Sequence, residues 1–155
     1  MPLPFFHAAS APVTFTSPLR SGHVTYAMRR FELESYLKYM EQYEIPEVLA
    51  VPPMVIAIIM SPLSKKYSLR KTFNATFGAA PMDKDTQRRF LSLMAPDAKC
   101  SQVWGLTEST CVTTQFQWPE KDDTGSVGRF VPNMEAKYVF LQVLVLLTNM
   151  SKAGQ

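Results

Sequence analysis

Strand-like and helix-like segments alternate through the middle of this chain, and this alternation restricts the fold more than any other feature. The strand-like segments are residues 47–51, 73–77 and 99–103. The helix-like segments are residues 31–43, 52–60 and 83–95. Such an alternation predicts an α/β fold, with a partial, doubly wound, mostly parallel sheet and helices on both faces. In sheets of this kind, ligands bind beyond the carboxyl ends of the strands.

Local signals set the expected boundaries. Apolar residues recur at helical spacing from Leu33 to Tyr43, so we expect that stripe to lie in the core. Pro52 is suited to the first turn of a helix, and the apolar run that follows it predicts a helix buried on all sides. Asp83 is a candidate N-cap. Residues 22–28 alternate weakly and predict a strand, whereas residues 62–69 predict a loop.

Composition excludes several classes of protein. With 155 residues and 46% hydrophobic content, the chain is long enough for one domain with a core. A net charge of +3 from scattered basic residues argues against a nucleic-acid partner. Two cysteines make no disulfide framework and no zinc spacing, so we expect a reducing, intracellular location. No apolar run is long enough to span a bilayer, and no signal peptide is evident.

The residues with the clearest chemistry lie in the segment Gln102–Ser109, which follows the third expected strand. Trp104 offers a flat face for a purine, and Gly105 lets a ligand approach the backbone. Thr107 can donate a hydrogen bond to a phosphate oxygen. Glu108 is the kind of oxygen ligand that Mg²⁺ takes alongside substrate phosphates. A polar turn after a strand would explain the same residues without any ligand, so this segment is not sufficient alone.

Further segments occur in a fixed order around this one. They are Leu3–His7, Gly78–Pro81, Thr124–Arg129 and Pro132–Lys137. Together with Gln102–Ser109, they resemble the large domain of adenylate-forming (AMP-binding) enzymes, particularly acyl-CoA ligases of the 4-coumarate–CoA ligase type. The resemblance covers residues 1–139 and implies a partial AMP-binding domain, with the start of a β-rich subdomain after Thr124. Residues 140–155 do not follow the family and are interpreted as a separate tail.

The resemblance implies ATP-dependent activation of a carboxylic acid to acyl-AMP, followed by transfer to CoA, with Mg²⁺ as cofactor. It implies catalytic roles for His7, Thr107 and Glu108, with Glu108 also the metal ligand. The residues implied to contact the nucleotide are Ala80, Gln102, Trp104, Gly105 and Thr107. The residues implied to border the acid are His7, Ala9, Phe77, Gly78, Ala79 and Val103. Arg30 is implied to lie near the phosphates of CoA. A cytoplasmic or peroxisomal location follows, although no C-terminal Ser-Lys-Leu is present.

Departures from the family leave alternatives open. A Gly/Ser/Thr-rich phosphate loop with its lysine, a Thr-Gly-Asp ribose motif and a small C-terminal domain with a catalytic lysine are expected but not found. The chain is therefore either part of an acyl-CoA ligase that is active only when intact, or an inactive remnant. A third hypothesis is that the chain is an adenylation domain of a peptide synthetase. It is disfavoured because Leu106 stands where those domains usually carry proline. Ala9 and Val103 replace a tyrosine and a glycine, which favours a fatty or polyketide-like acid over a hydroxycinnamate.

Overall fold

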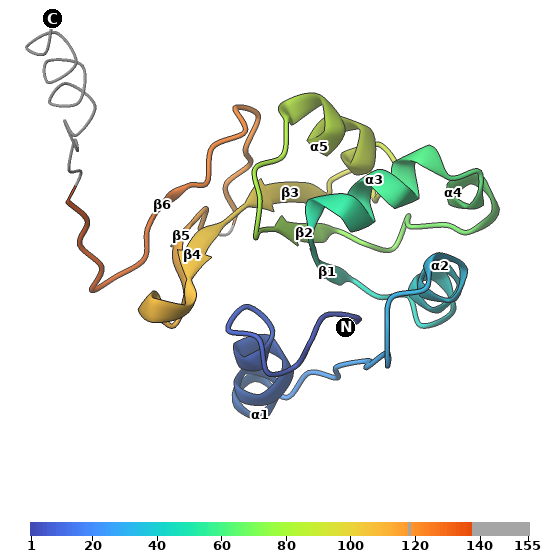
Figure 1. Cartoon of the computed structure of the whole chain (residues 1–155). Helices are drawn as coiled ribbons and strands as arrows, with labels where there is room; N and C mark the ends of the chain where they lie inside the picture. Colours follow the sequence, from blue (N-terminus) through green and yellow to red (C-terminus); the bar gives the residue numbers. More distant parts are fainter. Residues whose placement is uncertain (118, 138–155) are drawn as a thin grey trace, which may run out of the picture.

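The computed structural model describes residues 1–117 and 119–137, which form a parallel sheet followed by a small antiparallel sheet (Figure 1). The parallel sheet has the order β1-β2-β3 and comprises β1 (Glu47–Ala50), β2 (Asn74–Phe77) and β3 (Lys99–Gln102). The antiparallel sheet has the order β4-β5-β6 and comprises β4 (Trp104–Leu106), β5 (Cys111–Gln115) and β6 (Arg129–Phe130). Only Val103 separates the two sheets. The expected α/β class and parallel sheet are confirmed, and the β-rich structure is present but begins at β4, before the expected Thr124.

The helices are distributed unevenly around the parallel sheet. They are α1 (Ser17–Ser21), α2 (Leu33–Gln42), α3 (Pro52–Met60), α4 (Leu63–Lys66) and α5 (Lys84–Leu91), with a π-helical turn, η1, at Pro12–Thr16. Because both crossovers move along the sheet in the same direction, α3 and α5 lie side by side on one face (Figure 1). The N-terminal segment with α1 lies on the other side of the sheet, and α2 lies beyond β1 (Figure 1).

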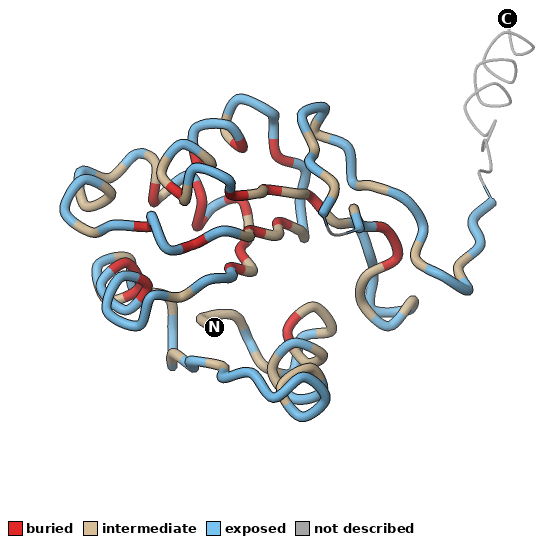
Figure 2. Tube along the Cα trace, turned by 180° about the vertical axis from the view of Figure 1, so that it is seen from behind, coloured by how far each residue is buried: buried red, intermediate tan, exposed pale blue. Residues whose placement is uncertain are grey.

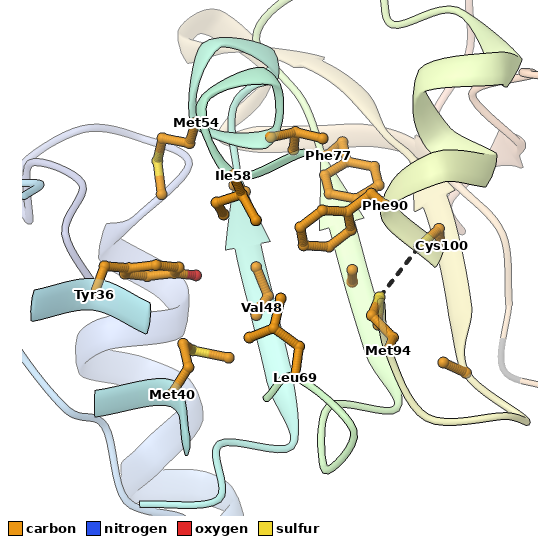
Figure 3. Packing of buried hydrophobic residues seen from close by; sticks show 14 of the residues in the cluster. Tyr36, Met40, Val48, Met54, Ile58, Leu69, Phe77, Phe90, Met94 and Cys100 are labelled. Atoms are coloured by element: carbon orange, nitrogen blue, oxygen red, sulfur yellow. Dashed lines mark hydrogen bonds between the residues drawn. The ribbon is translucent and has the colours of Figure 1, made fainter. Parts of the chain in front are cut away.

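Strand register explains which side chains enter the core. Val48 pairs with Ala75 and then Cys100, so these three side chains point to the same face of the sheet. That face is buried, as Figure 2 shows by its red segments along the strands. Under α3 and α5, the ring of Phe77 meets the ring of Phe90 edge to face at 5.5 Å (Figure 3). The opposite face of the sheet is left partly open.

Capping residues account for two helix starts. The Asp83 carboxylate accepts hydrogen bonds from the backbone N–H groups of Asp85 and Thr86, at 3.0 and 2.9 Å, which confirms the predicted N-cap of α5. Glu32 caps α2 in the same way, through the N–H groups of Glu34 and Ser35. The sequence prediction did not include this second cap.

Several local expectations were wrong. Residues 22–28 form no strand; Met28 instead donates a backbone hydrogen bond to Met1 at 3.0 Å. The expected loop after Pro62 contains the short helix α4, which starts where Ser61 Oγ accepts from the Leu63 N–H at 3.2 Å. Helix α3 is not buried all round: Met60 is 68% exposed, because only one side of α3 faces the sheet and α5.

The helical turns at residues 12–21 were also not anticipated. Pro12 and Pro18 stand at first-turn positions, where the absent N–H costs nothing. Gly22 ends α1 in the left-handed conformation, with φ of 69°. This proline-start, glycine-end pattern was the signal present in the sequence.

Candidate functional site

A groove of about 1070 Å³ separates the N-terminal segment from the open face of the parallel sheet. Its floor includes Leu49 of β1 and Thr76 of β2, whose side chains point away from α3 and α5. One end lies at the carboxyl edge of the strands, and the other reaches Tyr43 at the end of α2. The groove therefore runs the length of β1 and opens at the edge where ligands bind in parallel sheets.

Eight predicted site residues line this groove, although they come from three distant parts of the chain. They are His7, Ala9, Gly78, Ala79, Val103, Gly105, Thr107 and Glu108. Five predicted residues do not line it: Arg30, Phe77, Ala80, Gln102 and Trp104.

His7 lies in the turns that precede η1, and its side chain is exposed. Its Nδ1 accepts a hydrogen bond from the backbone N–H of Ala9 at 3.1 Å. In a neutral imidazole with Nδ1 accepting, the proton is on Nε2. His7 therefore presents an N–H donor to a ligand.

Thr107 and Glu108 begin the 3₁₀ turn η2 (Thr107–Ser109), directly after β4. Both are exposed, and their side chains make no hydrogen bond or ion pair with any other described residue. The turn itself is secured beneath them, where the hydroxyls of Ser109 and Thr113 are 2.7 Å apart. A hydroxyl and a carboxylate are thus held at the groove with their donor and acceptor atoms unused.

The backbone that follows η2 is strained. Thr110 and Cys111 have φ of 61° and 97°, a region that residues other than glycine rarely occupy. Backbone strain of this kind costs of the order of 1–3 kcal/mol per residue and tends to occur at functional sites. The conformation of these two residues reverses the direction of the chain, so that β5 can pair with β4.

Gly105 also has a structural role that we did not expect. A Cβ at this position would lie 1.6 Å from the carbonyl oxygen of Cys111. Close pairing of β4 with β5 at the bulge between Trp104 and Gly105 therefore requires the glycine, whether or not a ligand is bound. Gly128 is required for the same reason, because its Cβ would lie 2.4 Å from the Gln115 oxygen.

The loop after β2 carries three of the predicted residues. Ala79 has φ of 71° and is thus also in the left-handed region. A Cβ on Gly78 would meet Val103 Cγ2 at 3.2 Å, so the two predicted pocket positions are in contact. Ala80 follows on the exposed side of the loop, outside the groove. Within the described chain, the backbone N–H groups of Ala79 and Ala80 donate to no carbonyl.

Phe77 and Gln102 point to the helix-covered face of the sheet rather than into the groove. Phe77 is fully buried against Phe90 (Figure 3). The Gln102 side chain is 3% exposed and bonds both backbone groups of Met82: Oε1 accepts from N at 2.9 Å, and Nε2 donates to O at 2.8 Å. Neither side chain therefore faces the groove. Trp104 is 46% exposed at the start of β4.

Arg30 lines a separate cavity of about 760 Å³ at the N-terminal end of α2, together with Arg29, Glu32, Ser35 and Tyr39. The Glu32 carboxylate already caps this helix end. Hydrogen bonds from Ser35 and Glu34, with a smaller contribution from the charge of Arg30, lower the pKa of Glu32. An anion here would approach two arginines but also an ionised glutamate.

Three tyrosines of the groove were not predicted. The rings of Tyr26 and Tyr43 are stacked at 4.6 Å, and Tyr39 lies 5.9 Å from Tyr43. All three line the groove. Tyr43 was expected in the core, but it is 43% exposed, because the helix ends one residue before it and its ring faces Tyr26. Helical spacing alone does not show which end of the stripe faces a cleft.

The donor set fits a magnesium ion that is held mainly by a substrate. In the described residues, no three His, Cys, Asp or Glu side chains come together as a metal site. Mg²⁺ is commonly bound by one or two carboxylates plus substrate phosphates and water. Glu108, unpaired at the groove, meets that requirement. Among the described helices, none is long and apolar enough to cross a membrane.

Comparison with known proteins agrees with this arrangement. The family model described as AMP-binding enzyme matches residues 1–139, and the chain belongs to that family. An acyl-CoA synthetase of Alternaria alternata is 49% identical over 138 residues, which is 89% of this chain and 24% of that protein. A phenylacetyl-CoA ligase of Aspergillus niger is 51% identical over 139 residues, covering 88% of this chain and 26% of that protein. The chain thus spans about a quarter of the length of these relatives.

Solved structures share the fold. A long-chain-fatty-acid–CoA ligase from Archaeoglobus fulgidus superposes with a TM-score of 0.73 at 21% identity, over 83% of this chain and 27% of that one. The O-succinylbenzoate–CoA synthetase of Bacillus subtilis, solved with ATP and magnesium, gives a TM-score of 0.59 at 18% identity. That match covers 74% of this chain and 22% of the synthetase.

Proposed function

We propose that this chain supplies the acid- and nucleotide-binding groove of an acid–CoA ligase, which activates a carboxylic acid with ATP and passes the acyl group to CoA. One observation carries the proposal. Eight residues chosen for this chemistry, from three distant segments, line a single groove at the carboxyl edge of a parallel sheet. Membership of the AMP-binding family and the similarity to acyl-CoA ligases support it.

Residues in and beside the groove have separate roles in the first step, in which the acid carboxylate attacks the α-phosphorus of ATP, forming acyl-AMP as pyrophosphate leaves. The Thr107 hydroxyl donates to a phosphate oxygen, and the N–H groups of Ala79 and Ala80 are free to donate to the nucleotide. Donors already in place stabilise the charge that develops in the transition state. The Glu108 carboxylate would hold Mg²⁺, which would offset phosphate charge. Trp104 offers its exposed face to the adenine ring.

His7 is positioned for the acid and for the second step, in which the CoA thiol displaces AMP. Its Nε2–H is available because Nδ1 is used by the Ala9 N–H. It therefore donates to the acid carboxylate or to the acyl oxygen and orients the carbonyl carbon toward the thiol. Arg30 and Arg29, in the separate cavity, provide positive charge for the phosphates of CoA.

The shape of the groove supports a fatty or polyketide-like acid as the substrate. Ala9 lines it at the position where the resembled hydroxycinnamate ligases carry a tyrosine, so the ring that would stack on a hydroxycinnamate is absent there. The groove continues along β1 as far as the tyrosines, which gives an extended chain a place to lie. The relative named as a phenylacetyl-CoA ligase makes phenylacetate the aromatic acid to compare.

The chain alone should bind nucleotide but not complete the reaction. The described lining of the groove contains no lysine or arginine, so no side chain of either kind is present to neutralise the phosphates during adenylation. The alternative hypothesis is that the chain is an inactive remnant that retains weak nucleotide binding. The two hypotheses differ in whether the groove supports formation of acyl-AMP once the rest of a ligase surrounds it.

A chimera decides between them. Residues 1–137 replace the matching segment of the A. niger ligase, and acyl-CoA formation is assayed with decanoate, phenylacetate and coumarate. We expect thioester formation with a preference for decanoate, and loss of activity when Glu108→Gln is added. A folded chimera that binds ATP but forms no acyl-AMP from any acid would refute the proposal. Preference for coumarate would refute only the choice of acid.

A further inference from the structure

Two loops, the first of which borders the groove, are joined by a network of buried polar side chains that have no part in the proposed reaction. The loops are residues 78–82, after β2, and residues 122–128, before β6. Between them lie Gln102, at the end of β3, and Gln87, in α5, which are 3% and 5% exposed. Buried amide side chains without partners are costly, so their hydrogen bonds show what they hold in place.

Gln102 holds the first loop. Its amide bonds both the N–H and the C=O of Met82, at 2.9 and 2.8 Å, as a neighbouring strand would. Met82 lies three residues after Ala79, whose left-handed backbone is unfavourable for an alanine. Such strain persists only where the surroundings enforce it. Gln102 therefore helps to hold Ala79 and Gly78 against the groove.

Gln102 and Gln87 extend the network to the second loop. Gln102 Nε2 also lies 3.2 Å from the carbonyl oxygen of Gly125 and 3.4 Å from Gln87 Oε1. Gln87 Nε2 in turn donates to the Cys100 carbonyl at 2.9 Å and to Asp122 Oδ2 at 3.4 Å. Gln87 thus joins β3, the helix α5 and the second loop.

Asp122 organises the second loop from inside. Its carboxylate accepts from the N–H and hydroxyl of Thr124, both at 2.8 Å, and from the Gly125 N–H at 3.1 Å. Burial raises the pKa of Asp122, but the hydrogen bonds from Thr124, Gln87 and Gly125 outweigh it and lower the pKa overall. An ionised carboxylate with four donors defines one loop conformation.

We infer that Gln87 and Asp122 are positioning residues, which act through Gln102 to tie the loop at residues 78–82, where Gly78 and Ala79 line the groove, to the loop at residues 122–128. This inference rests on the proposed function for the identity of the ligand. The network itself reaches no substrate, since neither Gln87 nor Asp122 lines the groove. Its effect on the ligand is indirect: it keeps the backbone N–H groups of Ala79 and Ala80 at the edge of the groove.

The test compares Gln87→Met with Thr72→Val in the 155-residue chain. Methionine keeps the volume of Gln87 but removes its donors. Thr72→Val is the matched control, because it removes a similarly buried hydrogen bond, from Thr72 Oγ1 to the Ile45 carbonyl at 2.9 Å, at the other end of the sheet. Backbone amide exchange is measured for Met82 and Gly125, and the Kd for Mg-ATP is measured by calorimetry.

We expect Gln87→Met to speed exchange at Met82 and Gly125 at least tenfold and to weaken Mg-ATP binding at least fivefold. Thr72→Val should lower the melting temperature without either effect. Gln87→Glu should not rescue binding, because its carboxylate would face the Cys100 carbonyl and Asp122. Unchanged exchange in both loops, or faster exchange with unchanged Mg-ATP affinity, would overturn the inference while leaving the proposed function intact. A wild-type chain that binds no nucleotide would instead overturn the proposed function, and the role assigned to the network with it.

Discussion

Replacing Gly105 with alanine tests whether this glycine is needed for the pairing of β4 with β5 or for the approach of a ligand. The structure indicates how far the substitution should lower the free energy of unfolding. The new Cβ would lie 1.6 Å from Cys111 O, 2.6 Å from Cys111 C and 2.9 Å from Val112 Cα. All three atoms belong to the backbone of the paired strand β5, so no side-chain rotation relieves the clash. Overpacking typically costs about 1–3 kcal/mol, and we expect the upper end of that range here.

The control for this substitution is Gly78→Ala, in the loop after β2. Its Cβ would meet Val103 Cγ2 at 3.2 Å, and a shift of a few tenths of an ångström in that side chain is sufficient. Alanine also restricts the unfolded chain at both sites, which offsets the cost by about 0.4–1 kcal/mol. We therefore expect Gly78→Ala to change the free energy of unfolding by less than about 1 kcal/mol.

Urea denaturation followed by circular dichroism, without ligand, measures both variants. The account predicts that Gly105→Ala lowers the midpoint clearly and Gly78→Ala hardly at all. If Gly105→Ala were as stable as the wild type but lost nucleotide affinity, the reasoning would be refuted. The glycine would then serve the approach of a ligand rather than the pairing of β4 with β5.

The other predictions use single substitutions or thiol labelling. Thr110→Gly should raise stability by about 1 kcal/mol, since glycine tolerates the φ of 61°, and an unchanged urea midpoint would contradict the strain. Asp83→Ala should lower the melting temperature at neutral pH. The side-chain hydrogen bond from Thr86 and the two backbone N–H bonds lower the pKa of Asp83, so its carboxylate stabilises the fold above the ordinary pKa of 3.8. The difference in melting temperature between the variant and the wild type should vanish as the pH falls through the lowered pKa. Burial raises the pKa of Cys100 to about 12, so maleimide should modify Cys111 first and Cys100 only on unfolding. Equal modification rates of the two cysteines in the folded protein would contradict the burial of Cys100. Glu108→Gln should weaken Mg-ATP binding at least fivefold without changing the melting temperature, and an equal dependence of affinity on Mg²⁺ in both proteins would show that Glu108 is not a metal ligand.

Features that depend on nearby sequence were predictable. Asp83 caps α5 because its carboxylate reaches the N–H groups two and three residues ahead, a purely local geometry. The three parallel strands were visible as short strand-like segments between helical patterns. The meeting of His7, Gly78 and Glu108 at one groove follows from the resemblance and from the carboxyl-edge rule together.

Features that depend on partners distant in sequence were not predictable. Only glycine fits at position 105, because the Cys111 backbone lies against it. That approach depends on the strained residues Thr110 and Cys111, which reverse the chain direction. Gln102 was interpreted as a nucleotide contact, but its amide is used by Met82 and points to the covered face of the sheet. Tyr43 continued a helical stripe, and only its stacking on Tyr26 shows that it faces the groove.

The central claim is that three distant segments form one binding groove for an activated acid. An NMR titration of the ¹⁵N-labelled chain with a non-hydrolysable acyl-adenylate, a decanoyl sulfamoyl adenosine, tests it directly. The account predicts that the amides of Ala9, Ala79 and Thr107 shift together with one Kd, while those of Lys65 in α4 and Ser92 after α5, which do not line the groove, do not shift. Shifts confined to one segment, or no saturable shift at any of these amides, would contradict the account.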